Sequence, residues 1–370
     1  MKVGFISFHS FANPGGVKNH ILGLSKEFEK RGIETKIIVP RRKLWEKYGN
    51  NVILLGTSIP INIAGTQGDF VLNFNPIAIK KVLEREKFDV LHFHNFIAPS
   101  AVQILEKSKS LNVVTFHANM EASPIIEGMI KALSRTINNN VSGIIGVASF
   151  NLSLFDKFKG LKKVIPNGID LEEFNPSIKK LGKFRKNKIN ILFLGRIEER
   201  KGLIYLLKAY KILQEKYDNL RLIIVGDGPL KGECQEYTQR NKLREVYWEG
   251  SQTGKIVPRY FSTCDIYCSP AIFGESFGIV LLEAMACGKP VTGFSNIGYK
   301  ELLKNTKGES FLAEPKNEKE LALKIEKLVI DEKLRKEMGE WGIKESKKYS
   351  WEKIADKVLL FYKNCKKLKS

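Results

Sequence analysis

Two glutamates, Glu275 and Glu283, stand eight positions apart in the apolar stretch FGESFGIVLLEAMACGKP, residues 273–290. Two carboxylates can serve as an acid/base pair, as metal ligands, or as acceptors of hydrogen bonds from hydroxyl groups. We expect a helix to start at Ser276 and Phe277, and eight helical residues rise about 12 Å. Carboxylates that far apart do not act on one bond or share one metal ion. The spacing therefore favours two hydrogen-bonding positions at the two ends of one elongated ligand.

The start of this expected helix, after Ser276, offers an anion-binding site between the two carboxylates. The first amide N–H groups of a helix have no partner inside it, and the helix dipole adds positive charge there. The N–H groups of Phe277, Gly278 and Ile279 can therefore hold a diphosphate. The alternative is a core helix with one stray acid, but burying Glu283 without a partner in IVLLEAMA would be costly.

Three cations stand in the stretch LGRIEERKG, which we expect at a turn from a strand to a helix: Arg196, Arg200 and Lys201. A guanidinium group forms paired hydrogen bonds with phosphate oxygens, and an ammonium group adds a compact positive charge. This turn suits a diphosphate. A solvent-exposed basic loop is the alternative.

Two glycine-rich turns at expected strand ends also suit a nucleotide. Gly15 and Gly16 in SFANPGGVKNH let backbone N–H groups approach a phosphate or sugar, although this is not the GxGxxG motif of dinucleotide folds. Gly226, Asp227 and Gly228 in VGDGPL suit contact with a base or ribose. An ordinary strand-to-helix turn is the alternative at the first of these sites.

All five histidines lie in the first 117 residues. They are His9, His20, His92, His94 and His117. His94 and Asn95 end one expected strand and His117 ends the next, so both strand ends can meet a substrate, with His94 and Asn95 on the acceptor side. A metal site built from these histidines would lack a carboxylate at suitable spacing, so we predict no metal site. We expect His20 to be structural.

The composition is that of a globular protein with a large excess of positive charge. The chain has 370 residues, 43% of them hydrophobic, and a formal net charge of +21. The length predicts two domains of similar size. The charge indicates either a lysine-rich surface or an anionic partner, of which a membrane surface is the first candidate. No nucleic-acid-binding motif accompanies the charge, so we predict no nucleic-acid partner.

Cysteine usage and hydropathy predict a cytoplasmic protein. The five cysteines are odd in number and show no paired spacing, which favours reduced thiols. No apolar run approaches the ~18 residues of a membrane helix. The start, MKVGFISFHSF, has too short an apolar run for a signal peptide. We expect a monomer or weak dimer, either free in the cytoplasm or peripheral at the inner face of the membrane.

Short apolar strands alternate with amphipathic helical stretches along the chain, which predicts an α/β fold with parallel sheets. One series occupies residues 1–175, and a polar, basic segment at 176–188 is the expected linker. A second series fills residues 189–349, and a last helix occupies 350–370. Two doubly wound domains of this kind would face a cleft at the carboxyl ends of their strands.

The motif set resembles one known family. GESFGIVLLEAMACGKPV is similar to the donor motif of the retaining glycosyltransferases with the two-domain B-type fold (group 1 / family 4). PGGVKNH, LGRIEERKG, IPNGID and VGDGPL resemble the same family in the same order. The stretches DVLHFHNFIAPS, TFHANM and CDIYCSP look most like those of the phosphatidylinositol mannosyltransferases. The resemblance covers nearly the whole chain.

The resemblance implies roles for individual residues. Glu275 would bind hydroxyl groups of the donor sugar, and Glu283 those of the ribose. Arg196 and Lys201 would neutralise the diphosphate leaving group, aided by the N–H of a glycine in the first turn. His117 would hydrogen-bond the donor sugar near the reacting carbon. Gly16 is the glycine whose N–H would assist Arg196 and Lys201.

The resemblance also implies two Rossmann-like domains, with the C-terminal helix crossing back to the first. The family transfers a hexose with retention and without an essential metal or cofactor, from a nucleotide-sugar donor. GDP-mannose is favoured by likeness, and a UDP-sugar is the alternative. The acceptor would be a lipid or glycan. In lipid-acting relatives a basic amphipathic stretch meets the membrane, but here the corresponding residues 59–76 contain no Lys or Arg. Basic RRKLWEKYG, residues 41–49, could substitute, with Trp45 as an interfacial anchor.

Three alternative functions stay open from the sequence. The first is transfer to a soluble sugar, sugar phosphate or polyol. The second is a nucleotide-sugar 2-epimerase, which uses the same fold but is expected to need histidines from both domains, whereas this chain has none after residue 117. The third is a non-catalytic module that binds sugar nucleotides, which the full set of charged motif residues disfavours.

Overall fold

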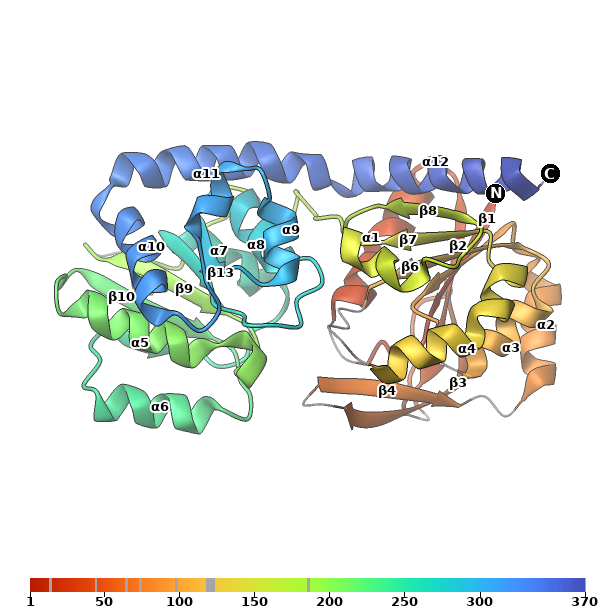
Figure 1. The fold of residues 1–370 in the computed structure, drawn as a ribbon, viewed down its shortest axis with the longest axis horizontal. Helices are drawn as coiled ribbons and strands as arrows, with labels where there is room; N and C mark the ends of the chain where they lie inside the picture. Colours follow the sequence, from red (N-terminus) through yellow and green to blue (C-terminus); the bar gives the residue numbers. More distant parts are fainter. Residues whose placement is uncertain are drawn as a thin grey trace. The chain divides into compact units, whose positions relative to one another are not determined.

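The described residues form two sheets flanked by helices (Figure 1). The computed structural model describes residues 1–12, 15–43, 45–63, 66–72, 75–96, 99–117, 124–184 and 187–369. The chain divides into two units, the first made of residues 1–168 and 351–370 and the second of residues 169–350.

The first unit is built on a sheet that has eight strands in the described part of the chain. Its order is β4-β3-β2-β1-β5-β6-β7-β8, with parallel pairing throughout except between β3 and β4, which are antiparallel. The strands are β1 (Lys2–Ser7), β2 (Glu34–Arg41), β3 (Val52–Ile63), β4 (Thr66–Leu72), β5 (Val90–His94), β6 (Leu111–Phe116), β7 (Gly143–Gly146) and β8 (Leu161–Val164). The run β3-β2-β1-β5-β6-β7 has the doubly wound order of a Rossmann fold.

Five helices of the described residues accompany this sheet: α1 (Gly16–Lys30), α2 (Pro76–Glu86), α3 (Pro99–Lys107), α4 (Pro124–Asn140) and α12 (Trp351–Lys369). In α1 the buried residues Ile21, Leu24 and Phe28 recur at helical spacing, so one stripe faces the core. The side chain of Asn75 caps α2 by accepting a hydrogen bond from the N–H of Ala78 at 3.0 Å.

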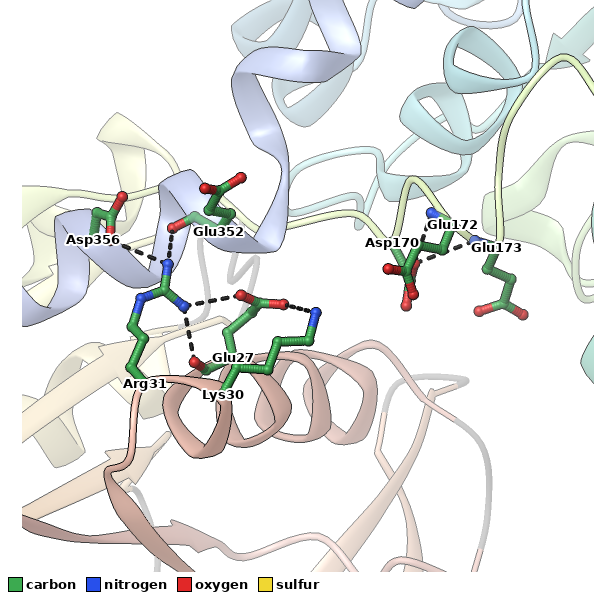
Figure 2. A network of polar contacts seen from close by, with 8 residues as sticks. All are labelled: Glu27, Lys30, Arg31, Asp170, Glu172, Glu173, Glu352 and Asp356. Carbon is green, nitrogen blue, oxygen red and sulfur yellow. Dashed lines mark hydrogen bonds and ion pairs between the residues drawn. The ribbon is translucent and has the colours of Figure 1, made fainter.

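The C-terminal helix α12 packs on α1 within the first unit. Arg31, at the end of α1, donates to the carbonyl of Glu352 at 3.0 Å and to the carboxylate of Asp356 at 3.1 Å (Figure 2). Trp351 packs against glycines, because a Cβ added at Gly23 or at Gly168 would overlap its indole ring. Trp351 of α12 therefore fits against α1 because position 23 carries no side chain.

The second unit has a sheet of six strands in the residues described, in the order β11-β10-β9-β12-β13-β14 and parallel throughout. The strands are β9 (Ile189–Leu194), β10 (Leu220–Val225), β11 (Val246–Trp248), β12 (Ile266–Ser269), β13 (Val291–Phe294) and β14 (Leu312–Ala313). This order is again the doubly wound one. The structure thus confirms the predicted α/β class with two Rossmann-like units.

The helices of the second unit are α5 (Leu203–Gln214), α6 (Lys231–Arg240), α7 (Val257–Thr263), α8 (Ile279–Ala286), α9 (Ile297–Leu303), α10 (Glu318–Ile330) and α11 (Glu332–Ser346). Single 3-10 turns join several elements, among them η3 (Glu199–Lys201) after β9. Figure 2 also shows Asp170 near the start of this unit, where its carboxylate accepts hydrogen bonds from the N–H groups of Glu172 at 2.9 Å and Glu173 at 3.2 Å. These bonds close a turn that fixes the backbone before Glu173.

The boundaries between the two units lie close to those predicted for the two domains. Residues 176–188, predicted as a linker, belong to the second unit. The second unit begins at Ile169, and Leu181 and Phe184 are buried, the first 8% and the second 2% exposed. Both belong to the core of this unit. Residues 185 and 186 of the segment lie outside the described residues.

The position of α8 differs from the sequence prediction. The helix begins at Ile279 rather than at Ser276, because Gly278 has a φ of 96° that is left-handed and interrupts helical geometry. A Cβ at Gly278 would also overlap the ring of Tyr299. The estimate of about 12 Å between Glu275 and Glu283 is wrong in its premise, since only residues 279–283 of that spacing are helical.

Two stretches that the sequence analysis considered for membrane contact, residues 59–76 and 41–49, are only partly covered by the described residues. The stretch 59–76 includes β4 and the end of β3, but residues 64, 65, 73 and 74 lie outside the described residues, as does Leu44 in the basic stretch 41–49. Trp45 is 76% exposed. No helix in the described part of the chain is long and apolar enough to cross a membrane.

Candidate functional site

In each sheet the strand order reverses beside the first strand of the unit. Doubly wound sheets bind ligands outside the carboxyl ends of the strands at this point. In the second unit the reversal lies between β9 and β12. The loop after β9 carries Arg196, Arg200 and Lys201, and the loop after β12 carries Glu275. The topology therefore brings three cations and one carboxylate to the same edge.

Glu275 is the meeting point of these charges. Its side-chain oxygen Oε1 accepts hydrogen bonds from Lys201 Nζ at 2.5 Å and from Arg200 Nη1 at 3.1 Å. Glu275 is only 9% exposed, so a lone carboxylate here would be costly, and the two cations compensate it. The same cations would be attracted to a phosphate that reached this edge.

A second buried carboxylate, Glu198, organises the loop after β9. Its two oxygens form ion pairs with Arg200 Nε at 2.5 Å and with Arg196 Nε at 3.2 Å. Glu198 is 7% exposed, whereas Arg196 reaches solvent. Glu198 thus aligns two guanidinium groups, the kind of donor that suits phosphate oxygens. The sequence analysis did not single it out, although two adjacent glutamates inside a basic turn were the available signal.

The backbone joins the loops after β9 and β12. The N–H of Ile272 donates to the carbonyl of Arg200 at 2.8 Å. Gly202 has a φ of 65°, and a Cβ there would overlap the carbonyl of Pro270. A glycine is therefore required at the point where the basic turn approaches β12.

The turn after β10 packs closely against the loop after β9, which carries the basic residues. A Cβ at Gly226 would overlap the carbonyl of Gly195, and Gly226 has a φ of 152°. A Cβ at Gly228 would overlap the carbonyl of Ile197, whose N–H donates to the carbonyl of Asp227 at 2.9 Å. These glycines allow two loops at the switch point to touch through their backbones.

Asp227 has partners within its own turn. Its carboxylate accepts hydrogen bonds from Lys231 Nζ at 2.9 Å and from the N–H of Gly228 at 2.8 Å. Lys231, and then this N–H, lower the pKa of Asp227. The side chain therefore stabilises the turn that leads into α6, and its predicted role in donor binding stays a prediction.

The first amide N–H groups of α8 have no acceptor within the helix. Within the described residues, no acceptor is bonded to the amide N–H groups of Gly278, Ile279 and Val280. Phe277 is buried against Tyr349, with ring centroids 5.7 Å apart, so only its backbone could meet a ligand. The sequence analysis assigned this role to the N–H groups of Phe277, Gly278 and Ile279, and the binding of an anion at this helix start stays a prediction.

Glu283 lies on the second turn of α8 and is half-buried. Burial raises the pKa of Glu283 to about 8, Glu173 adds to this shift, and Lys201 opposes it. A carboxylate with such a pKa is poorly compensated in the absence of a ligand. Hydroxyl groups that donate to it would supply what the surrounding residues do not.

A group of buried histidines lies at the corresponding edge of the first unit. His94 Nδ1 and His117 Nε2 are 3.0 Å apart, and the His20 ring packs edge-on against both rings, with centroids at 5.2 and 4.7 Å. Burial lowers the pKa of His20 to about 4 and the pKa values of His94 and His117 well below the usual range. These imidazoles are therefore neutral near pH 7.

Asn95 supports this group through the backbone. It has a φ of 59°, a conformation that asparagine tolerates better than most residues. Its side chain accepts a hydrogen bond from the N–H of His117 at 2.9 Å, and its own N–H donates to the carbonyl of Thr115 at 2.9 Å. Asn95 thus fastens the end of β5 to the end of β6.

Comparison with family models covers most of the chain. Residues 14–173 match the model of "Glycosyltransferase Family 4", and residues 174–345 match that of "Glycosyl transferases group 1". The phosphatidyl-myo-inositol mannosyltransferase of Mycobacterium leprae is 30% identical over 370 residues, which cover 98% of this chain and 96% of the relative. The chain belongs to the group 1 / family 4 glycosyltransferases. The corresponding protein of Propionibacterium freudenreichii is 30% identical over 83% of this chain and 81% of its own length.

Solved glycosyltransferase structures share the fold. Anabaena HepE in complex with UDP superposes with a TM-score of 0.79 at 21% identity, covering 98% of this chain and 100% of that one. Sucrose-phosphate synthase from Thermosynechococcus elongatus gives a TM-score of 0.77 at 18% identity and covers 98% of each chain. Both confirm the predicted two-domain B-type fold.

Within the second unit, the glycosyltransferase brings together most of the predicted site residues. Glu275 contacts Arg200 and Lys201, and Arg196 joins them through Glu198. The turn at 226–228 and the start of α8 belong to the same unit. The individual roles assigned to these residues stay predictions.

The remaining predicted residues lie in the first unit. His94, Asn95 and His117 meet at the ends of β5 and β6, as described above. Gly15 and Gly16 stand at the start of α1, where a Cβ at either would meet nothing within 4 Å. Packing therefore does not require these two glycines, which leaves close approach of a ligand as a reason for them.

Proposed function

We propose that this glycosyltransferase moves a mannose from a nucleotide diphosphate sugar, GDP-mannose in the first place, to a hydroxyl group of a lipid or lipid-linked acceptor, with retention of configuration. The observation that carries the proposal is the contact of Glu275 with Lys201 and Arg200 at the switch point of the second unit. It combines an acceptor for sugar hydroxyls with cations for a diphosphate in one place.

The charges suit the departure of a nucleoside diphosphate. As the bond between the sugar C1 and the phosphate oxygen breaks, negative charge grows on that phosphate. Arg196 and Lys201 would stabilise this charge, together with the free N–H groups at the start of α8. Basic side chains and a helix end in these positions take the place that a divalent metal would otherwise fill at the diphosphate.

Retention follows if the acceptor attacks from the side of the leaving group. The acceptor oxygen forms a new bond to C1, and its proton passes to the departing phosphate oxygen. The phosphate then serves as the base, so the enzyme needs no carboxylate pair around C1. Glu275 would hold hydroxyl groups of the sugar during this step, and Glu283 would hold those of the ribose.

Two observations support a lipid acceptor. The relatives from Mycobacterium leprae and Propionibacterium freudenreichii are phosphatidyl-myo-inositol mannosyltransferases by name. The chain carries a net charge of +21, and Trp45 is 76% exposed within the basic stretch 41–49. A cationic surface with an exposed aromatic residue is suited to anionic lipid head groups.

A screen of nucleotide sugars tests the proposal. The full chain is incubated with GDP-mannose, UDP-glucose, UDP-GlcNAc and UDP-galactose, with neutral liposomes or with liposomes containing phosphatidylinositol, and nucleotide release is measured. We expect release from GDP-mannose that depends on phosphatidylinositol. Release from no donor would overturn the proposal. Release that needs a soluble sugar or polyol instead of lipid would replace the acceptor.

A further inference from the structure

The histidine cluster of the first unit has a feature that hydrogen bonding leaves unexplained. His20 Nδ1–H donates to Asn167 Oδ1 at 2.8 Å, which leaves the lone pair of this neutral ring on Nε2. His20 Nε2 is buried and has no partner among the described residues. A lone pair in the interior without a donor is an unsatisfied acceptor.

Of the neighbouring histidines, His94 also carries a buried ring nitrogen without a partner among the described residues. His94 Nδ1 and His117 Nε2 are 3.0 Å apart, and His94 Nε2 is a second buried atom without a partner among the described residues. One nitrogen from each of His20, His94 and His117 can be chosen so that all three lie within 4.8 Å of one another. Nitrogens bound to one tetrahedral zinc ion at about 2.0–2.1 Å are roughly 3.3 Å apart. The nitrogens here lie within 4.8 Å of one another, a wider spread, so a bound ion would draw the three rings together.

We propose that His20, His94 and His117 form a binding site for one divalent late transition metal ion of the zinc class. The three residues come from α1, the end of β5 and the position after β6, so the ion would tie three elements together at the switch point of the first sheet. Three imidazoles and no carboxylate favour zinc, cobalt, nickel or copper over magnesium and calcium, which prefer oxygen ligands.

The surroundings match those of metal-bound histidines. Such a histidine almost always donates its other ring N–H to a carbonyl or carboxylate, which fixes the tautomer, and Asn167 does this for His20. The sequence analysis predicted no metal site because a carboxylate was lacking, but three histidines with an open fourth position are a known zinc ligand set. This site lies in the first unit and is distinct from the charges proposed to hold the diphosphate, but it includes His117, for which the family resemblance implies a hydrogen bond to the donor sugar.

His92 provides a matched control within the same cluster. It is as buried as His94 and stacks on it, with ring centroids 4.5 Å apart. Both of its ring nitrogens are engaged, Nε2 with Thr115 Oγ1 at 2.6 Å and Nδ1 with the hydroxyl of Tyr362 at 2.6 Å. His92 therefore has no free lone pair to offer, and replacing it disturbs the cluster without removing a ligand.

The test is metal titration of the full chain after removal of any affinity tag and treatment with a chelator. Binding of Co²⁺ is followed by its visible absorption, and Zn²⁺ is added in competition. We expect one equivalent to bind. His20→Gln should weaken binding by more than the roughly 10–100-fold that loss of an outer-shell partner costs, and Asn167→Ala should weaken it within that range. His92→Gln should retain the affinity.

Thermal unfolding separates loss of the site from loss of the fold. Zn²⁺ should raise the melting temperature of the wild type and of His92→Gln, but not that of His20→Gln, since only a folded site gains from the ion. Absence of stoichiometric Co²⁺ and Zn²⁺ binding by the wild type would overturn the proposal, as would unchanged affinity of folded His20→Gln. In that case the contact between His94 and His117 is a hydrogen bond only. No nucleotide sugar enters this test, so its result is independent of the proposed transfer reaction.

Discussion

Glu198 and Glu199 are neighbours in the basic turn of the second unit, yet their environments differ. Glu198 is buried and paired with Arg196 and Arg200, whereas Glu199 is exposed and belongs to the 3-10 turn η3. The position of both guanidinium groups thus depends on one carboxylate. Sequence reasoning found the cations, but burial decides which of two identical acids organises them.

We expect Glu198→Gln to lower kcat/KM by about 10- to 100-fold, because displacing a positioned group by about 1 Å can cost that much. The affinity for a nucleoside diphosphate should fall more than that for the nucleoside, since the arginines would contact phosphates. Glu199→Gln is the control and should behave as the wild type. Equal effects of the two substitutions would show that Glu198 does not position the arginines.

The ionisation of the Glu283 carboxyl makes the stability of the folded chain depend on pH. Its pKa is about 8 in the folded chain against a usual value of 4.5, so the folded state holds a proton that the unfolded state has released between these values. Stability contributed by this residue is therefore present below pH 4.5 and is lost as the pH rises toward 8. Each pKa unit of difference corresponds to about 1.4 kcal/mol.

Glu283→Gln should remove this pH dependence. The free energy of unfolding of the variant, compared with that of the wild type, should be similar near pH 4.5 and increasingly favourable to the variant up to pH 9. Chemical denaturation across this range measures the difference. The same variant should bind the nucleotide sugar more weakly if Glu283 holds the ribose. A stability difference that does not change with pH would contradict the assigned pKa.

Among the elements, α12 shows how a helix far along the chain completes the first unit. Trp351 packs on Gly23 of α1, where no Cβ fits. Arg31, at the end of α1, donates hydrogen bonds to Glu352 and Asp356 of α12. Gly23→Ala should therefore lower the free energy of unfolding by about 1–3 kcal/mol, the usual cost of overpacking. Urea denaturation followed by tryptophan fluorescence measures it.

A glycine in another helix provides the control for this prediction. Gly128 in α4 is exposed, and a Cβ there would meet nothing within 4 Å. Gly128→Ala should stabilise the chain by about 0.5–1 kcal/mol through helix propensity alone. If both alanine variants are stabilised alike, the tight packing of Trp351 on α1 is wrong.

The elements that the sequence predicted well are those with strong local periodicity. The amphipathic pattern of residues 17–30 predicts a helix, and α1 begins one residue earlier, at Gly16. The pattern of residues 203–217 also predicts a helix, and α5 ends at Gln214. The start of α8 was predicted too early because the left-handed conformation of Gly278 depends on the ring of Tyr299, which is distant in sequence. Local patterns carry no information about that contact.

Contacts between distant segments also explain what the sequence left open in the candidate sites. His20, His94 and His117 meet only because β5 pairs with β6, with His94 opposite Thr115, and because α1 packs against the same edge. The sequence placed His94 and His117 at strand ends from the strand patterns alone. It gave no reason to bring His20 to them.

At the scale of the whole molecule, two Rossmann-like units and the motif order identify a glycosyltransferase, while the charge of +21 bears on its acceptor. Net charge governs association with anionic surfaces rather than the fold. The proposed lipid acceptor and the exposed Trp45 belong to this scale, because both concern what the surface meets.

The most direct test of the account is transfer of labelled mannose from GDP-mannose to liposomes containing phosphatidylinositol, measured as label extracted with the lipid. The wild type should place label in the lipid fraction, and Glu275→Gln should reduce this rate by about 100-fold or more, as loss of a transition-state contact does. Label that never enters lipid, or a Glu275→Gln variant that transfers as fast as the wild type, would contradict the central claim.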